Sequence, residues 1–147
     1  MTDKLIMTVD SGDIVIKLRP DLAPKHVAQI TKLVEDGYYD GLTFHRVIPG
    51  FMAQGGCPDG TGMGGSGANI PAEFSDEPHA RGVCSMARSA SPDSASSQFF
   101  ICLDDANFLD GQYTVWGEVE SGMEHVDAIP KGEPPVVPGT IVKVVTA

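Results

Sequence analysis

Three features of the sequence predict a mainly β fold, arranged as a sandwich or a closed barrel. The 147 residues contain about eight short segments with the alternating apolar pattern of strands. Two further segments have the apolar spacing of helices, about enough to cover the open ends of a barrel. The 17 glycines and 11 prolines mark turns and loops between these segments. The length suits one domain and no linker divides the chain, so residues 1–147 are expected to form a single domain.

The first two strands are predicted to form a hairpin. Leu5, Met7 and Val9 alternate with polar residues in the first strand, and the second runs over 14–18. Gly12 stands between them in a short turn, where a glycine accepts the positive φ that hairpin turns require.

A helix is predicted next, over residues 24–36. Its first residue is proline, which suits a position where the missing N–H is not needed. Val27, Ile30 and Val34 follow at helical spacing and give the helix one apolar face. Gly37 is expected to end it.

Two strands over 42–47 and 51–54 are predicted to be joined by a tight turn. The connecting residues place a proline directly before Gly50, the order that a type II turn favours. If this hairpin closes, Gln54 returns close to Arg46.

Arg46 occupies an unusual place in this pattern. Strand alternation puts Phe44, Arg46 and Ile48 on one face and His45 and Val47 on the other. Arginine is almost never buried without a partner, so its presence on an apolar face indicates a pocket lined by Arg46 or an exposed side chain.

The second half of the chain continues the β pattern. Strands are predicted over 83–87, 98–103, 113–119 and 140–146, with a short helix over 121–129 that has Ser121 as its N-cap. Within 98–103, Gln98 and Phe100 share one face. Phe99, Ile101 and Leu103 share the other and are expected in the core.

Charge and cysteine content exclude several classes of function. The net charge is −10, and residues 47–130 contain 12 acidic side chains against only Arg81 and Arg88, which disfavours a nucleic-acid partner. No apolar run approaches the ~20 residues of a membrane span, and the N-terminus lacks the pattern of a signal peptide. Cys57, Cys84 and Cys102 form no CxxC pair, so a reducing cytoplasm is expected.

The sequence carries no strong signal for metal, nucleophile or nucleotide chemistry. The four histidines have no metal-ligand spacing, although Cys57 near His45 would be the best case for a metal. The serine cluster over 91–97 lacks a GxSxG elbow, and the glycine run over 60–65 lacks the GKS/T ending of a phosphate loop. No metal and no cofactor are therefore expected.

Four blocks together resemble the cyclophilin family of peptidyl-prolyl cis-trans isomerases. They are FHRVIPGFMAQGG, which begins at Phe44, and the segments GVCSMAR, SQFFI and FLDGQYTVWG in that order. The resemblance covers nearly the whole chain and is greatest to the short bacterial cytosolic form. It implies a closed eight-stranded antiparallel β-barrel capped by two α-helices. It also implies a monomeric cytoplasmic isomerase that acts on proline-containing peptides and on unfolded or folding proteins.

The resemblance also assigns residues. Arg46, Gln54 and Phe51 correspond to the family's catalytic positions, with Met52, Phe100 and Leu109 completing the apolar pocket for the proline ring. Positions that correspond to the substrate groove are Ala87, Arg88, Ser89 and Gln98. Phe108 and Tyr113 stand where many eukaryotic members have tryptophan and histidine, which implies only weak binding of cyclosporin.

Rotation about an X-Pro bond breaks no covalent bond, so it needs no nucleophile, metal or acid–base pair. The arginine fork suits it, because a twisted amide has a nitrogen lone pair that a fixed cation can stabilise. Two other hypotheses remain: a docking domain for proline peptides without catalysis, and a redox response through Cys57.

Overall fold

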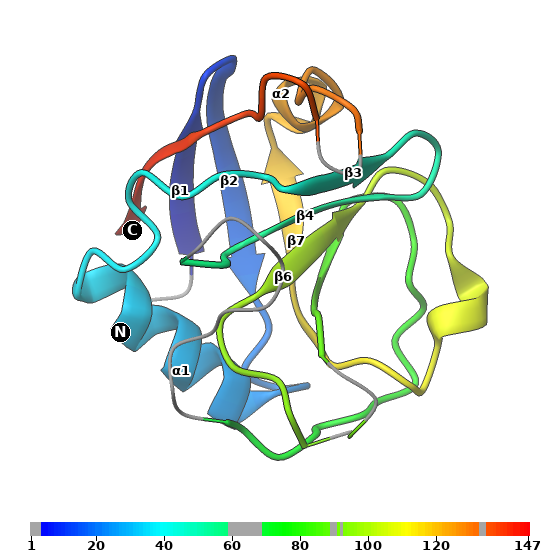
Figure 1. The fold of residues 1–147 in the computed structure, drawn as a ribbon. Coiled ribbons are helices and arrows are strands. Elements are labelled where there is room, and N and C mark those ends of the chain that lie inside the picture. Colours follow the sequence, from blue (N-terminus) through cyan, green and yellow to red (C-terminus); the bar gives the residue numbers. More distant parts are fainter. Residues whose placement is uncertain (1–3, 59–68, 89–90, 92, 133–134) are drawn as a thin grey trace.

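The computed structural model describes residues 4–58, 69–88, 91, 93–132 and 135–147. Within these residues, eight antiparallel strands form one curled sheet in the order β3-β4-β6-β5-β7-β2-β1-β8 (Figure 1). The strands are β1 Lys4–Val9, β2 Gly12–Leu18, β3 Arg46–Ile48, β4 Met52–Gly55, β5 Val83–Met86, β6 Phe99–Cys102, β7 Val115–Ser121 and β8 Ile141–Thr146. The predicted mainly β class is confirmed.

The prediction of a closed barrel is wrong, because the curled sheet is open between its edge strands β3 and β8. Isolated bridges span this gap, one between Thr43 and Thr140 and another between Val47 and Gly132. Gly132, which pairs with Val47 of β3, is flanked in sequence by Pro130 and Pro135, and proline has no N–H to donate. A continuous ladder cannot form there, and single bridges take its place.

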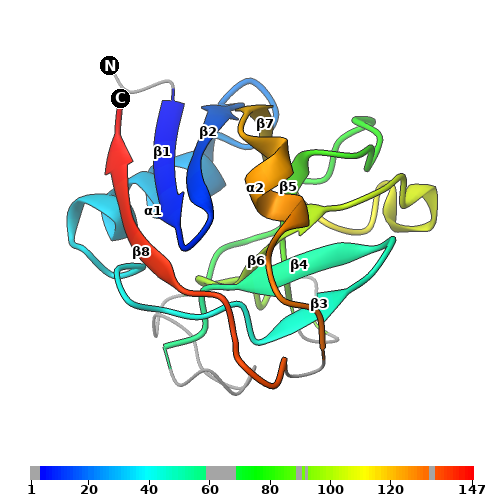
Figure 2. The same ribbon diagram turned by 90° about the horizontal axis from the view of Figure 1, so that it is seen from above.

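Two α-helices lie at opposite ends of the curled sheet (Figures 1 and 2). α1 spans Pro24–Glu35 and buries the predicted apolar face, and Gly37 follows it with φ +72°. α2 spans Met123–Asp127, shorter than predicted, and its N-cap is Gly122 rather than Ser121. A short 3-10 helix, η1 over Asn107–Leu109, was not predicted.

The β3–β4 hairpin closes as predicted. Gly50 has φ +70°, and the N–H of Phe51 donates to the carbonyl of Ile48 at 3.1 Å, as a type II turn requires. β3 begins only at Arg46, however, so the predicted alternation fails for Phe44. Phe44 is fully buried in the core, on the opposite side from the exposed Arg46.

β6 divides its side chains between two apolar clusters. Phe99 and Ile101 enter the main core between the sheet and α1, as the alternation predicts. Phe100 and Cys102 enter a second cluster on the other face of the sheet. Several of the residues that the sequence marks as candidates for the site lie in or against this second cluster, Met52, Phe100 and Leu109 among them.

Candidate active site

Sheet register places candidate residues in one row across neighbouring strands. Arg46 in β3 pairs with Gln54 in β4, Gln54 pairs with Phe100 in β6, and Phe100 pairs with Ser85 in β5. Residues paired directly across antiparallel strands point to the same face. The guanidinium, the amide and the aromatic ring are therefore set side by side by backbone hydrogen bonding, and the predicted proximity of Gln54 to Arg46 is confirmed.

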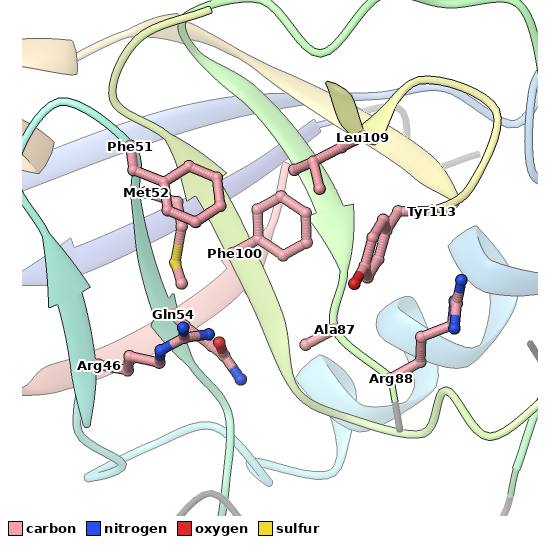
Figure 3. Close-up of a pocket in the computed structure, with 9 residues that line it drawn as sticks. All are labelled: Arg46, Phe51, Met52, Gln54, Ala87, Arg88, Phe100, Leu109 and Tyr113. Atoms are coloured by element: carbon pink, nitrogen blue, oxygen red, sulfur yellow. The ribbon is translucent and has the colours of Figure 1, made fainter. Parts of the chain in front are cut away.

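The row opens into a pocket of about 120 Å³ on this face of the sheet. Figure 3 shows the described residues that line it, which are Arg46, Phe51, Met52, Gln54, Ala87, Arg88, Phe100, Leu109 and Tyr113. All nine were candidates from the sequence. They come from β3, β4 and β6 and from the segments around η1 and after β5, so distant parts of the chain converge here.

The pocket has an apolar end and a polar side (Figure 3). Phe51, Met52, Phe100 and Leu109 surround the apolar end, while Arg46 and Gln54 lie together along one side. Phe100 and Tyr113 meet edge to face, with ring centroids 5.8 Å apart. The geometry offers a recess for a small apolar ring next to hydrogen-bond donors.

Gln98 lies outside the pocket lining but contacts it. The side-chain amide of Gln54 donates to the side-chain oxygen of Gln98 at 2.9 Å. This bond leaves the Gln54 carbonyl oxygen to face other donors and restrains the Gln54 rotamer. Gln98 therefore supports the polar side through Gln54.

Gly56 allows the close backbone approach beside this pair. It has φ +90°, and a Cβ there would lie 2.5 Å from the carbonyl oxygen of Ser97. The Ser97 hydroxyl in turn donates to the Gly56 carbonyl at 2.8 Å. A side chain at position 56 would push apart the end of β4 and the segment that leads into β6, beside Gln54 and Gln98.

Arg88 contributes to the pocket wall through Tyr113. Its guanidinium lies 4.6 Å from the Tyr113 ring centroid, on the side of the ring away from Phe100 (Figure 3). Its Nε and one terminal nitrogen both donate to the carbonyl of Gln112, at 3.0 and 2.7 Å. The ring of Tyr113 is thus held between an aromatic ring and a cation.

Two further candidates differ in position from the nine lining residues. Phe108 is 68% exposed and packs on Phe51 with ring centroids 5.4 Å apart, so it extends the rim of the pocket rather than its lining. Ser89 lies outside the described residues.

Three polar residues behind the pocket were missed from the sequence. His79 and Ser85 are fully buried, and Asp110 directly follows Leu109. The imidazole of His79 is hydrogen-bonded to both Ser85 and Asp110 and stacks on the Phe100 ring. No spacing rule links residues 79, 85 and 110, and only the fold brings them together.

The remaining candidates for chemistry are buried away from the lining. Cys57 is fully buried, and reaction of a thiol requires access. Burial and the neighbouring Arg46 cation lower the pKa of His45.

Among the described residues, no three His, Cys, Asp or Glu side chains are grouped to hold a metal ion. No helix in the described part of the chain is long and apolar enough to span a membrane.

Comparison with known proteins agrees with this geometry. The family model described as "Cyclophilin type peptidyl-prolyl cis-trans isomerase/CLD" matches residues 4–146. A probable peptidyl-prolyl cis-trans isomerase of Brucella suis is 56% identical over 140 residues, covering 87% of this chain and 71% of that protein. Peptidyl-prolyl cis-trans isomerase B of Bacillus subtilis is 48% identical over 126 residues, covering 84% and 87%.

Solved structures with the same fold carry the same description. Cyclophilin AquaCyp293 from Hirschia baltica aligns with a TM-score of 0.91 at 31% identity, over 98% of this chain and 73% of that one. A Cryptosporidium parvum cyclophilin type isomerase, crystallised in the presence of the dipeptide Ala-Pro, aligns with a TM-score of 0.90 at 30% identity, over 98% of both chains. The chain therefore belongs to the cyclophilin-type peptidyl-prolyl cis-trans isomerases.

Proposed function

We propose that the pocket isomerises X-Pro bonds by gripping the proline ring at its apolar end while Arg46 stabilises the twisted amide. The observation that carries this proposal is the register row, which sets Gln54 directly between Arg46 and Phe100. The reaction needs a recess that holds the proline ring and a donor that stabilises the twisted amide. An apolar recess and a cation lie together here.

The chemistry follows from the amide itself. Its C–N double-bond character gives a rotation barrier of ~18–20 kcal/mol. At the top of this barrier conjugation is lost, and the nitrogen carries a lone pair that accepts a hydrogen bond. A donor aimed at that nitrogen stabilises the twisted state more than either planar state, which is the condition for catalysis. Arg46 supplies a rigid, always charged donor for this purpose.

The required energies are within reach of such a site. A roughly 10⁵-fold acceleration needs ~7 kcal/mol, since each tenfold in rate needs ~1.4 kcal/mol. Oriented electrostatics and positioning together supply amounts of this size in enzymes. Gln54, restrained by Gln98, adds an oriented amide next to the guanidinium.

Proline-containing segments of peptides and of unfolded or folding proteins are the proposed substrates, and the cytoplasm is the proposed compartment. The presence of Ala-Pro with the related Cryptosporidium parvum protein supports a proline peptide as the ligand class. The Phe108 ring at the rim has no indole N–H and Tyr113 has no imidazole, so cyclosporin is expected to bind only weakly.

Substitution of Arg46 tests the proposal. Arg46→Ala should lower kcat on a proline tetrapeptide by ~10²-fold or more, the size of losing one preorganised donor at a transition state. Arg46 is exposed, so the fold should remain intact. The measurement is NMR exchange between the cis and trans peptide, with circular dichroism as the check on folding.

Arg46→Lys is the matched control, because it keeps the charge but loses the planar fork. It should recover part of the rate. Near wild-type turnover in Arg46→Ala would reject the role of Arg46. An inactive wild-type protein that still binds the peptide would favour the non-catalytic docking domain instead.

A further inference from the structure

A buried histidine stands directly behind the pocket. The imidazole of His79 stacks on the Phe100 ring with centroids 6.1 Å apart and planes inclined by 20°. The same imidazole meets the Tyr113 ring edge to face at 6.5 Å. Because Phe100 and Tyr113 also contact each other, the three rings form one packed triangle, and two of its members line the pocket.

The segment after β6 holds His79 through both its backbone and its ring. Oδ1 of Asp110 accepts the backbone N–H of His79 at 2.7 Å and lies 3.0 Å from its Nδ1. The carbonyl of His79 accepts the N–H of Ala106 at 2.7 Å. Leu109 lies between these two contacts in sequence, so His79 anchors the segment that carries Leu109 into the pocket.

The other ring nitrogen ties His79 to the sheet. Its Nε2 lies 3.0 Å from the hydroxyl oxygen of Ser85, the residue paired with Phe100 in the register row. His79 therefore connects the row to the Leu109 segment, and it contacts two of the pocket rings on the way.

Hydrogen-bond partners engage both ring nitrogens of His79, one on each side of the ring. Hydrogen bonds from His79 hold the pKa of the Asp110 carboxyl below its usual value, so Asp110 is an ionised acceptor. Nδ1 of His79 therefore carries the proton that lies between the two groups. The Ser85 hydroxyl donates to the carbonyl of Thr114 at 2.9 Å, and that carbonyl also accepts the N–H of Met86. Nε2 of His79 lies against the same hydroxyl oxygen.

Aspartate, histidine and serine in this order have the connectivity of a nucleophilic triad, but the position rules out that use. Ser85 and His79 are both fully buried, and the aromatic rings separate them from the pocket. No substrate carbonyl can reach the Ser85 hydroxyl. The bonds instead fix the plane of the His79 ring, and with it the rings that pack against it.

We propose that His79, oriented by Asp110 and Ser85, is a positioning residue that fixes Phe100, Tyr113 and Leu109 as the walls of the proline pocket. This inference rests on the proposed function of the pocket. The walls grip the proline ring in the planar and the twisted states alike. Looser walls should therefore weaken both states equally, which raises KM and leaves kcat nearly unchanged.

The first test replaces Asp110, whose side chain is partly exposed. Asp110→Ala should raise KM for a proline tetrapeptide by about tenfold, with kcat within about twofold, because it removes the partner of a buried ring. Asp110→Asn should have a smaller effect, since its amide oxygen can still accept the His79 N–H. Asp104→Ala, which removes an equal charge from the same segment without contacting His79, is the control and should leave KM unchanged.

The second test replaces the ring itself. His79→Phe keeps an aromatic ring but loses both side-chain hydrogen bonds, and it should raise KM as Asp110→Ala does. Thermal unfolding is measured for each variant, so that a loss of folded protein is separated from a change in KM. If one of these two variants fails to fold, the KM of the other decides.

Unchanged KM in a folded Asp110→Ala or His79→Phe variant would overturn the positioning role, even if the melting temperature falls. A fall in kcat at constant KM would overturn it equally. These results are distinct from failure of the proposed function, which would appear as inactive wild-type protein or as an active Arg46→Ala variant assayed in parallel.

Discussion

Phe99 and Phe100 are neighbours in β6, yet they belong to different parts of the molecule. Their exposed fractions are almost equal, 1% and 4%. Phe99 is surrounded by aromatic rings of the main core, which are those of Tyr39, Phe44 and Trp116. Phe100 packs against His79 and Tyr113 from behind and presents its remaining surface to the pocket.

The difference shows that burial alone does not distinguish a structural side chain from a functional one. The contacts of Phe99 are complete within the protein. Phe100 keeps part of its surface for a ligand, and the proposed ligand is a proline ring. Substitutions at the two positions should therefore separate stability from activity, and the following experiments test that separation.

The largest expected effect is on stability, from Phe99→Ala. Removing a fully packed aromatic side chain leaves a cavity that the surrounding rings cannot close, and the free energy of unfolding should fall by about 3–5 kcal/mol. Urea unfolding measures the change. The protein that remains folded should keep its KM, and a large rise in KM without loss of stability would break the comparison.

The next effect is on activity, from Phe100→Leu. The leucine keeps most of the apolar volume but loses the flat ring that forms the pocket wall, so kcat/KM should fall by about tenfold, the size of a poorer apolar fit. The free energy of unfolding should change less than in Phe99→Ala. Phe99→Leu is the matched control and should affect stability more than activity.

The smallest effect is expected from pH. The pKa values of His45 and His79 are both lowered from 6.5, chiefly by burial. Arginine side chains in general stay charged across this range. Asp110 faces His79 and opposes part of that lowering. Activity should therefore be flat between about pH 6.5 and 8 and insensitive to EDTA.

Stability should depend on pH below this range. The unfolded chain protonates its histidines near pH 6.5, whereas folded His45 and His79 resist protonation, so the free energy of unfolding should fall as pH decreases below 6.5. Urea unfolding between pH 5 and 8 measures this slope. A sharp break in kcat below pH 6.5, in protein that is still folded, would instead implicate His45 in catalysis.

Local patterns in the sequence predicted the elements and most of the pocket. Alternation separated Phe99 from Phe100 correctly because β6 is regular, and the tight turn at Gly50 brought Gln54 to Arg46 because it set the hairpin register. The assignment of individual pocket residues depended on the family resemblance, since single residues such as Leu109 have no distinctive spacing.

Long-range features were predicted poorly. The predicted side of Phe44 was wrong because the strand begins at Arg46, four residues later than the predicted start at Leu42. The open sheet depends on how the chain around Gly132 meets β3, and the hydrogen bonds of His79 depend on three separate segments. Neither arrangement leaves a periodic signal in the sequence.

The bridge between β3 and Gly132 also affects how the protein behaves among other chains. Val47 uses both its N–H and its carbonyl, each at 2.8 Å, to pair with Gly132 at the edge of the sheet. An uncovered edge strand is a template on which extended segments of other chains can add and aggregate. An enzyme proposed to act on folding chains meets many such segments. The bridge to Gly132 occupies the backbone groups of Val47 with which such a segment would otherwise pair.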